Sequence, residues 1–143
     1  MNILGIVTYA IRAQIAAEDP TLEAQLTDSE NGLRVYFLTA PARAHYPWIR
    51  VTHVWGGYEN VINTQSFDAY FEVSAISPDM QEANQVASDV LDTLQGKRVA
   101  YPGNWSDWAG TTLITPASGI VEIQGEQFYS IGSVVRFRAN LLE

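Results

Sequence analysis

The chain has 143 residues and a mass of 15.8 kDa, a size typical of one domain with its own hydrophobic core. Hydrophobic residues make up 47% of it and aromatic residues 11%, so the composition excludes a disordered chain. The absence of cysteine excludes disulfides and thiolate zinc sites, and the net charge of −8 argues against non-specific binding to nucleic acid, because duplex phosphates would be repelled.

The first predicted element is a helix at residues 3–17. Its apolar residues recur at helical spacing and form one stripe: Ile3, Val7, Ile11 and Ile15. A signal peptide would need a positive leading region, and a membrane span would need a longer apolar run than Arg12 allows. We therefore expect a soluble helix that ends near Asp19-Pro20, with one further helical turn at residues 21–26.

Two strands are predicted next. A polar turn or loop at residues 27–32 leads into a β-prone segment at residues 33–38. Two prolines then interrupt regular structure before a second strand at residues 48–55. We expect Gly56-Gly57 to end that strand, and residues 58–66 to form a hairpin-like connection.

Residues 67–96 predict a strand that runs directly into a helix. Residues 67–75 alternate between apolar and polar, which is typical of a strand with one buried face. Ser77-Pro78-Asp79 supplies the start of the helix, with Ser77 as its cap, and Gly96 supplies a left-handed end. The apolar stripe comprises Met80, Ala83, Val86, Ala87, Val90, Leu91 and Leu94. We expect Phe71 and Leu91 both to be buried.

The rest of the chain predicts a loop and three strands. A loop at residues 101–110 precedes two short strands at 111–115 and 120–124, a tight turn, and a long one-sided strand at 128–141. The order of elements predicts a single α+β domain covering residues 1–143. Its expected architecture is an antiparallel sheet of four or five strands with two helices packed on one face.

No catalytic, cofactor or metal site is predicted. His45 and His53 lack a third ligand and HExxH-like spacing, and no serine lies in a nucleophile-elbow pattern. Gly56-Gly57 is not a phosphate-binding loop. The sequence therefore favours a protein that is not an enzyme and has no cofactor.

The loop at residues 101–110 is rich in large aromatic side chains. Tyr101, Trp105 and Trp108 stand beside Asn104 and Asp107. These residues could bind a sugar ring, anchor a contact between subunits, or fold back onto the core of their own chain. All three interpretations stay open at this point.

The segments follow one another in a recognisable order. They are the helix at 3–17, Leu33-Arg-Val-Tyr with Ala40-Pro41, Tyr46-Pro-Trp-Ile-Arg-Val with Gly56-Gly57, and the segments 67–75, 83–96 and 128–139. This order resembles that of the tail-completion, or tail-terminator, proteins of long-tailed (siphophage-type) bacteriophages. The resemblance covers nearly the whole chain except residues 101–119, where relatives are often shorter.

The resemblance implies a structural virion protein. Such proteins form a homo-oligomeric ring, usually of six copies, that caps the completed tail tube and joins it to the head connector. The implied partners are therefore the tail tube protein and the head–tail connector protein, with no specific nucleic-acid binding and no membrane. The implied location is the head-proximal end of the tail in the virion, and the host cytoplasm during assembly.

Two sets of residues are candidates for such a role. Tyr101, Trp105, Trp108, Arg136 and Arg138 are the interface candidates, the two arginines because they lie opposite the apolar face of the last strand. Asp28, Glu30 and Glu59 are the candidates for the lumen, because carboxylates there would repel the phosphates of a passing genome. The alternative function is a small carbohydrate- or peptide-binding module that uses the loop at 101–110.

Overall fold

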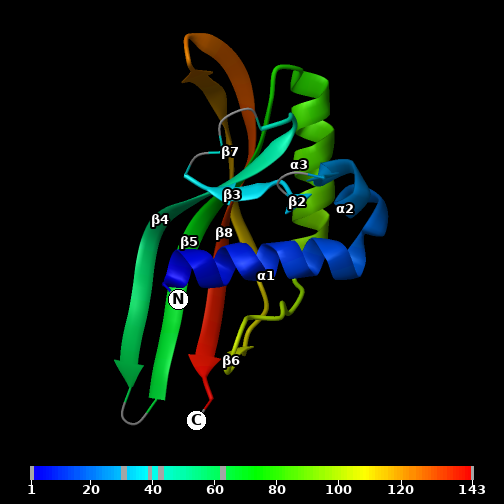
Figure 1. Ribbon diagram of the computed structural model, residues 1–143. Coiled ribbons are helices and arrows are strands. Elements are labelled where there is room, and N and C mark those ends of the chain that lie inside the picture. The colour runs from blue at the N-terminus through cyan, green and yellow to red at the C-terminus, as the bar shows by residue number, and fades with distance from the viewer. Residues whose placement is uncertain (1, 30–31, 39, 42–43, 62–63, 143) are drawn as a thin grey trace.

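The computed structural model describes residues 2–29, 32–38, 40–41, 44–61 and 64–142, and is shown in Figure 1. The helices are α1 (Ile3–Glu18), α2 (Pro20–Leu26) and α3 (Met80–Leu94). The strands are β1 (Thr27–Asp28), β2 (Gly32–Leu33), β3 (Val35–Phe37), β4 (Trp48–Val61), β5 (Thr64–Ser77), β6 (Trp105–Asp107), β7 (Thr112–Ile123) and β8 (Glu126–Leu141).

The main sheet confirms the α+β class but is larger than predicted, and it is mixed. Its strands lie in the order β3-β4-β5-β8-β6, and β7 also pairs with β8. The predicted all-antiparallel sheet of four or five strands is wrong because β3 pairs parallel with β4, with Val35 opposite Ile49. The segment that carries Pro41 and Pro47 returns the chain to the starting end of β3, so the next strand runs in the same direction. The predicted loop at 27–32 contributes the small β1–β2 pair.

Helices α1 and α3 pack on the same face of the sheet, as predicted, and the short α2 follows α1 (Figure 1). The cap of α3 is Asp79, whose carboxylate accepts a hydrogen bond from Gln81 N at 2.9 Å. Ser77, the predicted cap, belongs to the end of β5, and its hydroxyl donates to Glu82 Oε1 at 2.8 Å. Gly96 has a φ of +68° and ends the helix in the predicted left-handed conformation.

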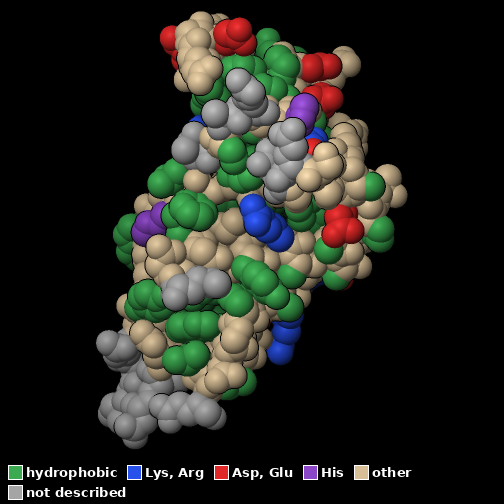
Figure 2. Space-filling model, viewed as in Figure 1, with side chains coloured by type: hydrophobic (Ala, Val, Ile, Leu, Met, Phe, Trp, Pro, Cys, Tyr) green, Lys and Arg blue, Asp and Glu red, His purple; other side chains and the backbone are tan. Residues whose placement is uncertain are grey.

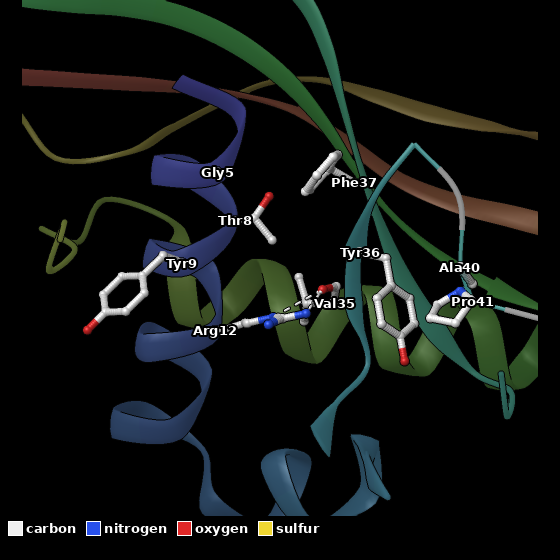
Figure 3. Close-up of a pocket in the computed structure, with 9 residues that line it drawn as sticks. All are labelled: Gly5, Thr8, Tyr9, Arg12, Val35, Tyr36, Phe37, Ala40 and Pro41. Carbon is white, nitrogen blue, oxygen red and sulfur yellow. Dashed lines mark hydrogen bonds between the residues drawn. The ribbon is translucent and has the colours of Figure 1, made fainter. Parts of the chain in front are cut away.

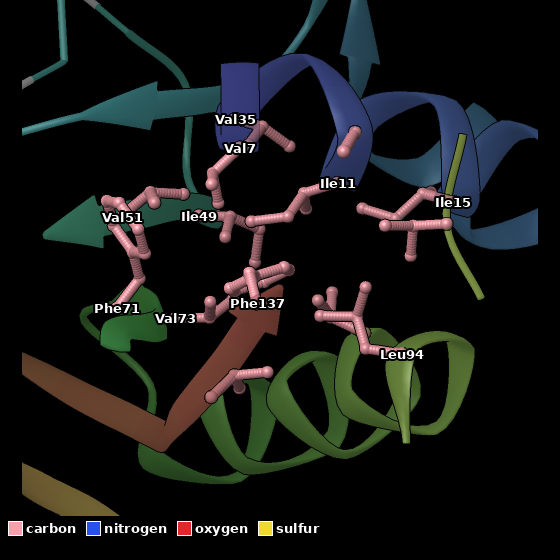
Figure 4. Packing of buried hydrophobic residues seen from close by; sticks show 14 of the residues in the cluster. Val7, Ile11, Ile15, Val35, Ile49, Val51, Phe71, Val73, Leu94 and Phe137 are labelled. Carbon is pink, nitrogen blue, oxygen red and sulfur yellow. The ribbon is translucent and has the colours of Figure 1, made fainter. Parts of the chain in front are cut away.

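The main core lies between these helices and the sheet (Figure 4). Phe71 is fully buried, as predicted, and so is Leu94. Leu91 is only half-buried at the flank of the helix, and Met80 in the first turn is 55% exposed. The buried stripe of α3 is therefore narrower than the apolar residues predicted, because the sheet contacts only the side of the helix that carries Ala83, Val86, Val90 and Leu94.

A second buried cluster lies on the other face of the sheet and consists of Tyr36, Trp48, Ile76 and Phe128. The ring of Tyr46 stacks on that of Phe128, with the ring centres 4.6 Å apart. The buried side of β8 therefore changes along the strand. Phe128, Ser130 and Gly132 are buried in its first half, where Tyr129 is exposed, whereas Val135, Phe137 and Ala139 are buried in its second half. The alternation of residues within the strand could not predict this, because side chains from distant parts of the chain, such as Tyr46, cover the face that alternation left exposed.

Gly56-Gly57 does not end β4, contrary to expectation. The strand continues to Val61, and its pairing with β5 shifts register between His53 and Trp55. Gly56 has a φ of +85°, and a Cβ there would lie 2.3 Å from the carbonyl oxygen of Asp68. The glycine is therefore part of a bulge inside a long strand. In the same way β7 is one strand with an irregularity between Leu113 and Thr115, where two short strands were predicted.

The core assignment predicts different costs for two leucines of α3. Leu94→Ala should lower the free energy of unfolding by about 2–5 kcal/mol, because the fully buried side chain leaves a cavity. Leu91→Ala should cost clearly less, because that side chain is only half-buried. Urea denaturation of both variants measures the difference, and equal costs would show that the helix is rotated from its assigned orientation.

Candidate interaction surface

The face of the sheet away from α1 and α3 carries a group of charged and aromatic side chains. We call it the arginine–aromatic face; it comprises Trp55, Asp68, Tyr70, Trp108, Arg136 and Arg138. Strand register places Trp55, Tyr70 and Arg136 in one row across β4, β5 and β8, and Asp68 opposite Arg138 in the next row. Alternation predicted that both arginines would oppose Val135 and Phe137, and the burial of those two residues agrees.

Contacts between aromatic rings and guanidinium groups run along this face. The rings of Trp55 and Tyr70 have centres 5.6 Å apart, and the guanidinium carbon of Arg136 lies 5.5 Å from the centre of the Tyr70 ring. The guanidinium carbon of Arg138 lies 5.3 Å from the centre of the Trp108 ring. Trp55 is 69% exposed and Trp108 48% exposed, so large aromatic surfaces remain available to a partner.

The two arginines differ in how their charge is compensated. Arg136 Nε donates to Asp68 Oδ1 at 2.8 Å and forms an ion pair with it, and this hydrogen bond lowers the pKa of Asp68. Arg138 donates to the Thr112 hydroxyl at 3.4 Å, and none of the described carboxylates forms an ion pair with it. Of the two predicted interface arginines, Arg138 is therefore the one without an ion pair among the described residues, although Asp68 lies opposite it in the sheet.

The predicted aromatic loop is partly a strand, and two of its three large side chains fold back onto the chain's own core. Tyr101 is 7% exposed and meets Phe67 edge-on, and burial raises its pKa, as does the nearby Asp107. The ring centre of Trp105 lies 5.1 Å from that of Phe67. The Asp107 carboxylate accepts hydrogen bonds from the backbone N–H groups of Val99, Ala109 and Gly110, which ties together the segments on both sides of β6, and β6 itself pairs with β8. Only Trp108 of the three remains exposed.

The lumen candidates lie in different environments. Asp28 lies in β1, its side chain is 13% exposed, and its Oδ2 is 3.6 Å from Nη1 of Arg34. Glu59 is exposed in β4, close to the end of that strand, and Glu30 lies outside the described residues. Asp28 and Glu59 were predicted to lie in loops. Asp28 lies instead in the two-residue strand β1, and Glu59 lies in the long strand β4. A lumenal role for any of the three stays a prediction.

Neither histidine has the surroundings of a metal ligand. Both are exposed, and Nε2 of His53 lies 2.7 Å from the carbonyl oxygen of Gly56. Within the described ranges, no group of three or more His, Cys, Asp or Glu residues could hold a metal ion. In the same part of the chain, no helix has both the length and the apolar character that crossing a membrane requires.

Sequence reasoning missed a groove of about 560 Å³ between α1 and the edge strand β3 (Figure 3). Tyr9 and Phe37 are about half exposed in it, and Arg12 donates hydrogen bonds to the carbonyl oxygen of Val35. Arg12 thus meets a backbone group that the open edge of β3 leaves unpaired. On this side of the molecule, hydrophobic side chains gather over α1 and the adjacent strands, whereas most carboxylates lie at the top and the right edge (Figure 2). Alternation could not indicate the groove, because it depends on where α1 crosses the sheet.

Comparison with known proteins gives a likeness of fold. No family model matches the sequence, and no curated protein matches it. The structure is similar to a chain in the solved structure of the virion of a native gene transfer agent (GTA) particle, with a TM-score of 0.66 and 18% sequence identity. The likeness covers 95% of this chain and 96% of that chain, so the two share a fold over nearly their full length.

The Asp68–Arg136 pair predicts a pH-dependent stability. Because the pKa of Asp68 is lower in the folded than in the unfolded chain, the pair should stabilise the fold above the ordinary Asp pKa of about 4 and lose this effect as the pH falls further. Asp68→Asn should therefore be less stable than wild type at pH 6, and the gap should narrow toward pH 3. Urea midpoints across this range test the expectation, and a gap that does not vary with pH would contradict it.

Proposed function

We propose that this protein is a non-enzymatic structural component of a virion and, more narrowly, a tail terminator. In this role several copies form a ring that caps the completed tail tube and presents a surface to the head connector. The ring would lie at the head-proximal end of the tail, after assembly in the host cytoplasm. The observation that carries the proposal is the near full-length fold similarity to a chain of a virion.

Two arguments that use different information support this role. The fold similarity rests on backbone geometry at 18% identity, where sequence contributes little. The resemblance to tail terminators rests on the order of segments in the sequence alone, without any coordinates. Both lead to an assembled particle, although only the second concerns the tail terminator specifically.

The surface of the chain supports an assembling protein. Trp55, Trp108, Tyr9 and Phe37 are each about half exposed or more, and they lie on both sides of the sheet. Tryptophan, tyrosine and arginine dominate the energetics of protein interfaces, because they bury a large area around a polar group. Aromatic surface of this extent would be covered when subunits assemble.

The charge of the chain suits a passage for DNA. Several copies, each with a net charge of −8, would give the ring a negative electric field. Salt screens this field beyond about 8 Å at physiological ionic strength, so only carboxylates that line the bore would act on DNA inside it. Of the described candidates, Asp28 is compensated by Arg34. Glu59 is exposed where the β4–β5 hairpin extends past α1, and is therefore the better candidate for the bore (Figure 1).

The carbohydrate- or peptide-binding alternative loses its main support. A sugar site would need several exposed aromatic rings in the loop at 101–110. Tyr101 is buried and Trp105 packs on Phe67, so Trp108 is the one aromatic side chain of the three that stays exposed. The guanidinium of Arg138 already lies over the ring of Trp108, where a sugar would have to stack.

The proposal predicts a ring in solution. Light scattering of the purified protein should give the mass of several copies, and negative-stain images should show closed rings. A monomer at every concentration tested would contradict the proposal. Retention of that monomer on a sugar matrix would favour the alternative instead.

The proposal also predicts that the protein does not hold DNA. Fluorescence anisotropy with a labelled duplex should show no measurable binding at moderate salt, because the chain would have to overcome its own negative field. Tight binding with a steep salt dependence, indicating several neutralised phosphates, would contradict both the lumen role and the terminator assignment.

A further inference from the structure

We propose that copies of this chain associate head to tail, with the arginine–aromatic face of one copy against the solvent-exposed side of α3 in the next. The inference rests on the proposed ring and adds the two surfaces that build it. It commits to one partner, a second copy of this chain, and to one charge pair, Arg138 with the carboxylates of α3.

The first surface offers an unused cation. Arg138 is flanked by the ring of Trp108 on one side, and among the described residues it donates only to the Thr112 hydroxyl. Its Nε atom is buried and, within the described part of the chain, has no hydrogen-bond acceptor. Because the chain itself encloses Nε, a carboxylate of another copy would meet the terminal nitrogens of the guanidinium, one of which makes the exposed contact with Thr112. Trp55 and Trp108 supply apolar area at the two ends of the same face.

The second surface offers carboxylates that form no ion pair with any described Lys or Arg. Helix α3 contains no Lys or Arg in its sequence, and its exposed side presents Asp92 together with the half-exposed Asp89. Asp89 accepts a hydrogen bond from the Gln85 amide at 3.0 Å, whereas the third carboxylate, Glu82, is held by Ser77. Asp92 is thus the most available anion for Arg138.

The two surfaces also match in length. The row of the arginine–aromatic face crosses β4, β5, β8 and β7, which is about 14 Å at the usual spacing between strands. The stretch of α3 from Glu82 to Asp92 is about 15 Å long at 1.5 Å per residue. A straight helix with polar side chains can therefore lie along the row without leaving either end uncovered.

The position of the two surfaces sets the kind of assembly. Helix α3 packs on one face of the sheet, and the arginine–aromatic face is the other, so the surfaces point in opposite directions from one subunit (Figure 1). A contact between two different patches is heterologous, and it repeats from copy to copy until the rotation closes a ring.

A charge swap tests the inference. Arg138→Glu and Asp92→Arg should each weaken assembly about tenfold or more in the concentration of half-assembly, and more strongly at low salt. The double variant should recover most of the loss, because the pair is restored with its signs exchanged. Native mass spectrometry over a concentration series at two salt concentrations measures assembly, and circular dichroism checks the fold.

Two further variants sharpen the test. Arg98→Glu makes the same change of charge at an exposed position outside both surfaces and should leave assembly close to wild type. Trp108→Ala keeps every charge, should weaken assembly, and replaces Arg138→Glu as the test if that variant does not fold.

The outcomes separate the inference from the function on which it rests. If wild type forms rings and Arg138→Glu, Asp92→Arg and Trp108→Ala assemble as well as Arg98→Glu, the proposed surfaces are wrong and the ring function stands. Two weakened single variants without recovery in the double variant would also overturn the pairing. A wild-type chain that never assembles would overturn both the inference and the proposed function.

Discussion

The antiparallel pairing of β5 with β8 is the contact on which the rest of the molecule depends. It runs from Ser66 opposite Asn140 to Ser77 opposite Tyr129. At Gly132 the two strands approach so closely that a Cβ would lie 1.9 Å from the carbonyl oxygen of Val73. The register is thereby fixed, and a slip of one residue would move every core side chain to the opposite face. The same register brings Asp68 within hydrogen-bonding distance of Arg136. The pairing of β5 with β8 therefore determines both the core and the arrangement of charged residues on the opposite face.

Long periodic segments were predictable from the sequence, whereas pairing between distant segments was not. The helix at residues 3–17, the strand at 67–75 and the left-handed end at Gly96 all follow from local patterns that the structure confirms. The parallel contact of β3 with β4 depends on the path of a proline-containing connection, which periodicity does not encode. The predicted end of the strand at Gly56 was wrong for a related reason. Glycine occurs both where strands end and where they bulge, and the sequence does not distinguish the two.

The candidate surface was predictable only in part. Alternation identified the face that carries Arg136 and Arg138, but the compensation of Arg136 by Asp68 required the register of two strands far apart in the sequence. Tyr101 is buried and Trp105 half-buried in a segment that the Asp107 carboxylate ties together through three backbone N–H groups and that pairs with β8 as an edge strand. Such a role for one aspartate cannot be read from composition, since aspartate is common in loops of every kind.

The bulge at Gly56 affects how the exposed edge of β4 can pair with other strands. Among the described residues, β4 beyond Val51 pairs only with β5, so a long strand edge with unpaired backbone groups faces the solvent. A regular edge of this kind recruits foreign strands and leads to aggregation. The register shift between His53 and Trp55 twists the edge and breaks the ladder that an incoming strand would have to match. The irregularity thus makes this edge a poor template for a foreign strand.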